Sequence, residues 1–247
     1  MTGVRRDRRP MPERSRPSGA GPVSTGSTAR FGPYRGHTQR LRREDVLFRQ
    51  GEPVEAVFRI RRGLVKLVTY LRGGEARIVR LQRAGDWLGL AGFLGRPYGH
   101  TAVALSGITV ERFAMECLAR MRHDDAEALN ELLSQWHRDL AAADVWIAQF
   151  STGSVRQRVA RLIRYLAGLE ETDATRVHLP TVREMGEILG VRPESVSRVL
   201  ADLKRKSVLV PAGHGRHDTY RVDMARLATL RGGAATRPGK RLRAASG

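Results

Sequence analysis

The 247-residue chain has a single cysteine, Cys117, and no long apolar run. One thiol cannot build a disulfide framework, and it cannot supply a cysteine-based metal cluster within one chain. No stretch reaches the roughly 18 consecutive apolar residues that a membrane-spanning helix needs, so we expect no membrane association. The arginine-rich start lacks the apolar segment of a secretory signal. Together these absences predict a protein of the reducing cytoplasm.

The net charge of +19 is unevenly distributed along the chain. Residues 1–50 contain 12 basic and 4 acidic residues, residues 51–150 contain 13 and 12, and residues 151–247 contain 19 and 9. A general basic bias would spread over the whole chain, whereas here the middle is almost neutral. Clustered positive charge is typical of a protein that binds nucleic acid, because phosphates attract arginine and lysine.

Residues 1–40 are rich in arginine, proline, glycine and serine and show little apolar periodicity. Such a segment cannot bury enough apolar surface to offset the entropy it would lose on ordering. We therefore expect a disordered basic tail there. Residues 227–247 have a similar composition, and we expect a second flexible basic tail.

Residues 41–122 have the pattern of a small β-domain. Glycines interrupt this segment every 10 to 12 residues, and short apolar runs lie between them. Short strands at such regular spacing predict an all-β sandwich or barrel. The predicted strands are Val57–Ile60, Leu64–Tyr70, Arg77–Leu81, Thr101–Leu105 and Ile108–Phe113.

Residues 123–150 form a long predicted helix whose apolar side chains recur at about 3.5 residues, the coiled-coil period. Such a helix could bury its stripe on its own β-domain, but the length of the seam favours pairing with a second copy. We therefore predict a homodimer and a hinge at residues 151–154. The predicted seam comprises Leu129, Leu133, Trp136, Leu140, Ala143, Ile147 and Phe150.

The stretch from Thr181 to Lys206 predicts two short helices joined by a tight turn. Thr181 and Glu184 have the S/T-x-x-E spacing of a capping box. Gly190 stands where a helix end takes a left-handed conformation. Pro193 suits the first position of the next helix, because the N–H that it lacks would be unpaired there. The pattern is that of a helix-turn-helix.

The second of these helices has an apolar face and, away from it, Glu194, Ser197 and Arg198. Arginine can bind O6 and N7 of guanine with two hydrogen bonds, glutamate accepts from N4 of cytosine, and serine serves either partner. We predict that these three side chains read DNA bases, and that Arg192 and Ser195 contact bases or backbone. The alternative is an ordinary helical hairpin with a solvated polar face.

Two short apolar segments, residues 208–210 and 219–222, flank a glycine-rich turn after the helix pair. Strand, turn and strand predict a β-hairpin, the wing of a winged helix-turn-helix domain over residues 151–226. His214 and His217 lie in the turn, which we interpret as a phosphate contact rather than a metal site. The predicted phosphate contacts are Thr181, Lys204, Lys206, Arg216 and His217.

This order of β-domain, seam helix and winged helix-turn-helix resembles the CRP/FNR family of bacterial transcription regulators. The resemblance covers about residues 41–225 and is most specific in residues 190–198. The set of Glu194, Ser197 and Arg198 is similar to that of the FNR-type subgroup. The resemblance implies an α+β fold with a cyclic-nucleotide-binding-like β-roll, a dimerisation helix and a winged helix-turn-helix. It also implies a palindromic site with TTGAT-like half-sites.

The effector end of the chain resembles the family less closely. The candidate pocket residues are Gly89, Leu90, His100 and Thr101. The branch that binds cyclic AMP has a glutamate at the position of Leu90 and an arginine at the position of His100. Loss of that guanidinium removes a charge-assisted pair to phosphate, so we expect no cyclic AMP in the usual mode and predict no cofactor. The cysteine count excludes the four-cysteine iron–sulfur cluster of the FNR branch, and a haem bound by His100 is an alternative.

These observations predict a homodimeric, sequence-specific regulator of transcription that binds double-stranded DNA and responds to an unidentified signal at the β-roll. The resemblance implies contact with RNA polymerase if the protein is an activator. The alternative is an architectural DNA binder of low specificity, driven by its basic tails. We predict no enzyme, because we find no paired carboxylates, no nucleophile–base spacing and no phosphate-binding Gly-x-x-x-x-Gly-Lys loop.

Overall fold

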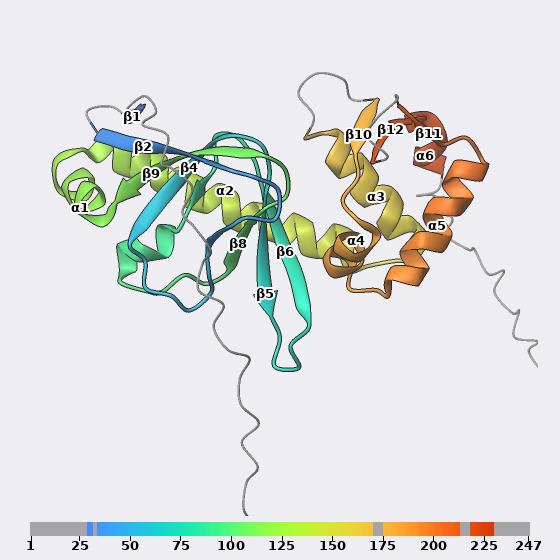
Figure 1. The fold of residues 1–247 in the computed structure, drawn as a ribbon, viewed down its shortest axis with the longest axis horizontal. Helices are drawn as coiled ribbons and strands as arrows, with labels where there is room; N and C mark the ends of the chain where they lie inside the picture. The colour runs from blue at the N-terminus through green and yellow to red at the C-terminus, as the bar shows by residue number, and fades with distance from the viewer. Residues whose placement is uncertain (1–28, 32–33, 170–174, 213–217, 230–247) are drawn as a thin grey trace, which may run out of the picture.

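The structure is a computed structural model that describes residues 29–31, 34–169, 175–212 and 218–229. It consists of an N-terminal β-roll and a C-terminal helical domain, with one long helix, α2 (Ala126–Phe150), running between them (Figure 1). Helix α1 (Met115–Asp124) follows the last strand of the β-roll and precedes α2. This is the predicted α+β architecture.

The β-roll is made of two antiparallel sheets that enclose an apolar core. The first sheet contains, in spatial order, β1 (Ala29–Phe31), β2 (Tyr34–Leu41), β9 (Ile108–Ala114), β4 (Ala56–Arg62) and β7 (Trp87–Leu88). The second contains β3 (Val46–Phe48), β8 (Thr101–Ala104), β5 (Val65–Tyr70) and β6 (Ala76–Gln82). Ile60, Val65 and Val110 are fully buried between the sheets. The five predicted strands are all present; β3, β7 and the 3₁₀ helix η1 (Leu90–Leu94) were not predicted.

The turn from β4 to β5 requires the glycine that the sequence supplies. Gly63 has φ +87°, a conformation that side chains disfavour. A Cβ atom at this position would collide with the carbonyl oxygen of Gly107, so the close approach of two turns also depends on it.

The predicted boundaries of the β-domain were wrong at its start. Residues 29–31 and 34–41 form β1 and β2, although we assigned residues 1–40 to a disordered tail. Strand β2 pairs with β9 from His37 to Leu41, so tertiary pairing, rather than local apolar periodicity, orders this segment. The rest of the predicted tail lies outside the described residues.

The C-terminal domain contains four helices and a small sheet among its described residues. The helices are α3 (Val155–Ala167), α4 (Val182–Leu189), α5 (Pro193–Arg205) and α6 (Met224–Thr229). The antiparallel sheet has the order β10 (Arg176–His178), β12 (Thr219–Val222) and β11 (Leu209–Pro211). The predicted hairpin is therefore confirmed as β11 and β12, whereas β10 was not predicted. Helix α6 extends into the segment 227–247 that we predicted to be a tail; residues 230–247 lie outside the described part.

Helix α2 ends at Phe150 and α3 begins at Val155, so residues 151–154, where we predicted a hinge, separate the two helices. Ser154 caps α3, since its hydroxyl accepts from the N–H of Gln157 at 3.3 Å. In the described parts of the chain, none of the helices combines the length and the hydropathy needed to span a bilayer.

Candidate nucleic-acid interface

The helix-turn-helix consists of α4, a turn at Gly190, and α5. The predicted capping box at the start of α4 is present: Glu184 N–H donates to the Thr181 hydroxyl at 3.2 Å, and the N–H of Thr181 donates to the Glu184 carboxylate at 2.8 Å. Gly190 has φ +61°, as the left-handed helix end requires. Pro193 occupies the first turn of α5. Local signals therefore determine both helix starts.

Helix α5 has one buried face and one open face. Val196, Leu200 and Leu203 are buried against the rest of the domain. Three of the remaining positions, Glu194, Ser197 and Arg198, are exposed, as predicted for base-reading side chains. Figure 1 shows α5 at the outer edge of the C-terminal domain, remote from the β-roll. This outer face is free to approach a DNA groove.

Arg192 and Ser195 also lie at the open end of α5. Arg192 is exposed and precedes the helix as its N-cap residue, while Ser195 is half-buried. The guanidinium of Arg198 lies 3.4 Å from the hydroxyl of Ser195, one turn earlier on the helix. A weak contact of this length leaves the guanidinium available to a base edge.

The described phosphate candidates lie at the ends of the two helices. Thr181 is the exposed N-cap of α4, an end at which backbone N–H groups attract anions. Lys204 donates to the hydroxyl of Tyr220 at 2.8 Å, which ties the end of α5 to β12. Lys206 lies 3.1 Å from Asp202, and its hydrogen bond is the largest of the effects that lower the pKa of that carboxyl group. The other two candidates, Arg216 and His217, lie outside the described residues.

One side of α2 exposes large apolar side chains. Leu133, Trp136, Leu140 and Ile147 are 50%, 39%, 65% and 60% exposed. Two further predicted seam residues, Leu129 and Ala143, are half-buried. Exposed apolar side chains of this size in one line favour an interface, because water solvates them poorly.

Phe150 does not belong to this seam, and its assignment was wrong. Its side chain is 2% exposed and packs inside the chain, with ring centroids 4.8 Å from Trp146 and 5.7 Å from Tyr165. The heptad spacing placed it correctly along the helix. The core of the C-terminal domain, however, begins at the end of α2 and covers this position.

The four predicted effector residues lie at positions 89–90 and 100–101 of the β-roll, and two of them, Leu90 and Thr101, are buried. Leu90 is buried with Trp87 and Phe113 in the β-roll core, and Thr101 is buried with its hydroxyl accepting from the N–H of Gln50 at 3.0 Å. Gly89 has φ +84° and precedes η1. His100 is half-buried; burial lowers the pKa of its imidazole, and the charge of Arg80 lowers it further.

The sequence reasoning missed a polar cluster between β6 and α2. Asp139 of α2 accepts from Gln135 at 2.9 Å and from Gln82 at 3.2 Å, and it lies 3.5 Å from the guanidinium of Arg80. Arg80 and Gln82 are more than 50 positions from the two α2 residues, and nothing in the sequence signals that the two pairs meet. Through these contacts, polar side chains of β6 and α2 join the β-roll to the long helix.

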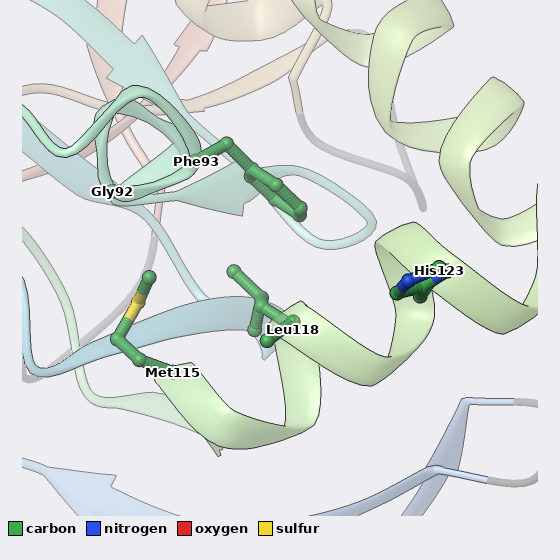
Figure 2. Close-up of a pocket in the computed structure, with 6 residues that line it drawn as sticks. Gly92, Phe93, Met115, Leu118 and His123 are labelled. Atoms are coloured by element: carbon green, nitrogen blue, oxygen red, sulfur yellow. The ribbon is translucent and has the colours of Figure 1, made fainter.

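A further pocket of about 440 Å³ lies between η1 and α1. Figure 2 shows the side chains of Phe93, Met115 and Leu118 around this space, with His123 at one end. None of these residues was predicted from the sequence, because the pocket forms only where two separate elements pack.

A β-roll joined by a long, partly apolar helix to a helix-turn-helix whose second helix exposes a polar face is the architecture of a DNA-binding transcription regulator. The family models agree with this division: residues 38–125 match the cyclic nucleotide-binding domain, and residues 157–230 match the Crp-like helix-turn-helix domain. The protein belongs to the CRP/FNR family of transcription regulators.

Two relatives each match more than three quarters of the chain. The transcriptional regulator LdrP of Thermus thermophilus is 28% identical over 199 residues, which is 79% of this chain and 97% of that protein. The transcriptional activator protein FnrA of Stutzerimonas stutzeri is 26% identical over 198 residues, 78% of this chain and 80% of that protein.

The solved structures show the same fold. TTHB099, a CRP-family transcriptional regulator from Thermus thermophilus, superposes with a TM-score of 0.68 at 27% identity, over 78% of this chain and 96% of that one. FixK2 from Bradyrhizobium japonicum has a TM-score of 0.69 at 23% identity, over 81% and 99% of the two chains, and is evidence for the fold alone.

Proposed function

We propose that the protein works as a homodimer that reads a palindromic DNA site with TTGAT-like half-sites. The observation that carries this proposal is the open face of α5, where Glu194, Ser197 and Arg198 are exposed above a fully packed opposite face. A rigid support matters because base discrimination depends on hydrogen-bond geometry. The two-fold symmetry of a dimer matches the symmetry of a palindrome.

The exposed seam of α2 supports the dimer. Leu133, Trp136, Leu140 and Ile147 line one side of the helix, while Leu132 and Trp146 on the other side are buried in the chain's own cores. Pairing two such seams removes apolar surface from water and brings the two C-terminal domains to a fixed distance. In such dimers the recognition helices lie about 34 Å apart, one turn of DNA.

Selection from a random duplex pool with the full chain tests the proposal. We expect enrichment of inverted repeats whose half-sites are centred about 10 bp apart. Enrichment of no motif would favour the second candidate, an architectural binder driven by the basic ends. A variant without residues 1–28 and 230–247 separates the two, because specific binding survives the truncation and architectural binding does not.

We also propose that the β-roll does not bind cyclic AMP in the mode of the cyclic-AMP branch, and that its signal is a different one. Leu90 faces the protein core, and position 100 carries a half-buried imidazole whose lowered pKa keeps it neutral at pH 7. A neutral imidazole cannot replace a guanidinium as the partner of a buried phosphate. A thermal shift with cyclic AMP equal to that of a cyclic-AMP-binding family member would contradict this. An absorption spectrum of the natively purified protein tests the alternative of haem on His100.

A role in transcription regulation also suggests where the protein works and which further partner it contacts. We propose that the protein works in the cytoplasm and contacts RNA polymerase at promoters that it activates. Pull-down of polymerase by the operator-bound dimer, but not by operator DNA alone, tests this contact.

A further inference from the structure

Four charged side chains meet where the helix-turn-helix packs on the β-roll. Lys66 of β5 donates to Glu184 of α4 at 2.7 Å and to Glu44 at 2.9 Å. Arg43, in the turn between β2 and β3, donates to the same Glu184 carboxylate at 2.9 Å. Lys66 is 7% exposed and Glu184 is 5% exposed. Two cations and two anions leave the cluster without net charge, as burial demands.

The carboxylate of Glu184 has two separate roles. Its Oε2 atom accepts from the N–H of Thr181 at 2.8 Å and from the Thr181 hydroxyl at 2.9 Å, and so closes the capping box of α4. The same oxygen accepts from Arg43, while Oε1 accepts from Lys66. The β-roll thus binds the Glu184 carboxylate, which caps the start of α4, the first helix of the helix-turn-helix.

The β-roll also approaches the other end of α4 closely. Arg77 of β6 lies over Gly190, so closely that a Cβ atom at Gly190 would overlap its guanidinium. Between the two ends, Ile188 and Leu189 share one buried cluster with Ile78 of β6. Contacts at both ends and along the middle define the direction of a helix, whereas a single contact would allow it to pivot.

The turn that supplies Arg43 and Glu44 is held in an unfavourable backbone conformation. Glu44 has φ +70°, in the left-handed region that residues with a side chain disfavour, and its N–H donates to the carbonyl of Ala104 at 2.8 Å. Such a conformation persists only where its surroundings hold it, and it concentrates at functional positions. Here it carries the side chain of Glu44 to Lys66.

We propose that Lys66, acting through Glu184, is a positioning residue for DNA binding. Together with Arg43 and Arg77, it holds the helix-turn-helix in one orientation on the β-roll, so that the two recognition helices of a dimer keep one separation. The inference rests on the proposed function as a dimeric reader of a palindrome. In this orientation Glu194, Ser197 and Arg198 are exposed, so the helix-turn-helix packed on the β-roll can still contact DNA.

The test measures spacing discrimination rather than affinity alone. Full-length protein is titrated, by fluorescence anisotropy, onto the selected palindrome and onto duplexes whose half-sites are moved together or apart by one or two base pairs. For the wild type we expect binding to the best spacing to be about tenfold tighter than to the altered ones. For Lys66→Met we expect this ratio of affinities to fall to about threefold or less, because each helix-turn-helix can pivot to reach a displaced half-site.

Matched variants separate positioning from general destabilisation. Lys66→Arg keeps the charge and should restore the ratio. Arg61→Met breaks a different ion pair, the 2.6 Å contact with buried Glu111 inside the β-roll, and should leave the ratio unchanged. Arg77→Gln releases the other end of α4 and should lower the ratio, which keeps the inference testable even if Lys66→Met does not fold.

The outcomes distinguish the inference from the function on which it rests. If Lys66→Met and Arg77→Gln keep the wild-type ratio, the positioning role is overturned and the dimeric reader stands. If the wild type itself shows no spacing preference, the dimeric reader is overturned and the positioning role with it. Discrimination against a substituted base within one half-site should stay at the wild-type level in all these variants, because α5 is untouched.

Discussion

The ammonium group of Lys66 lies 2.7 Å from a carboxylate oxygen of Glu184, although the two residues are 118 positions apart in the sequence. Lys66 belongs to strand β5 of the β-roll, and Glu184 belongs to α4, the first helix of the helix-turn-helix. Because both side chains are buried, neither can return to water without separating the two domains locally. This pair links the orientation of the helix-turn-helix to the β-roll, the domain that we propose receives the signal.

The pair makes stability depend on pH in a defined direction. Burial raises the pKa of Glu184, but hydrogen bonds from Lys66 and Thr181 outweigh it, and the net pKa lies below 4.5. Because the folded pKa is depressed, the stabilisation is fully present above the unfolded pKa and is lost as pH falls through the folded one. We expect Glu184→Gln, which keeps a capping side chain, to lower the unfolding free energy by about 3 kcal/mol at pH 7. Denaturant titrations should show a smaller difference from the wild type at pH 3.

Lys66 sets the other limit of the same pH window. Burial lowers its pKa, yet hydrogen bonds to Glu184 and Glu44 raise the net value above 10.5. Its contribution is therefore present below pH 10.5 and is lost only in stronger alkali. A difference between wild type and Glu184→Gln that stayed the same from pH 7 to pH 3 would contradict the assignment of this ion pair.

Replacing Arg198 should remove base discrimination at one position. The exposed guanidinium on α5 is placed for a bidentate contact, so Arg198→Ala should cost about 1–3 kcal/mol at one base pair and relax specificity there. Competition binding with singly substituted half-sites measures this. Arg164→Ala, an exposed arginine on α3, is the control and should leave the ranking of half-sites unchanged. Unaltered discrimination in Arg198→Ala would refute its role.

Lys204 should contribute to affinity without contributing to specificity. Lys204→Ala removes one phosphate contact, so all duplexes should be weakened about equally and the salt slope should fall by about 0.9. Tyr220→Phe is the matched control, since it removes the hydrogen bond to Lys204 but keeps the charge. A loss of affinity confined to some sequences would show instead that Lys204 reads bases.

A charge in the seam of α2 should separate the dimer. Leu140 is 65% exposed, and Leu140→Glu would place two carboxylates opposite each other across the paired helices. We expect the dimer dissociation constant to rise by more than about tenfold, with loss of binding to the palindrome. Ala142→Glu adds the same charge to an exposed position outside the seam and should remain dimeric. Sedimentation at micromolar concentration distinguishes the two, and a dimeric Leu140→Glu would rule out this seam.

Several elements could be predicted because their signals are local. The capping box of Thr181 and Glu184, the turn at Gly190 and the start of α5 at Pro193 each involve residues within one helical turn. Five strands of the β-roll, β4, β5, β6, β8 and β9, were also predictable from glycine spacing. Strands β1, β2 and β10 were missed, because they have little apolar pattern of their own. Strand β2 pairs with the distant β9 and β10 with the distant β12, while β1 pairs with β2.

The candidate site divides in the same way. The exposed positions Glu194, Ser197 and Arg198 follow from helical spacing alone, since the apolar residues of α5 define which face is buried. Leu90 was assigned to an effector pocket by resemblance, yet the structure buries it in the β-roll core. No spacing rule in the chain indicates which side of a loop will face a core that other segments build.

By itself, the sequence determined the helix-turn-helix, the exposed polar face of α5 and the existence of an apolar stripe on α2, because each depends on residues three to seven positions apart. Tertiary structure alone decided that Phe150 is buried in the core, where it packs with Trp146 and Tyr165, and does not line the exposed seam. It alone also brought Lys66 to Glu184. Contacts of this kind depend on how whole domains pack, and packing balances burial, charge and shape over segments that no local pattern relates.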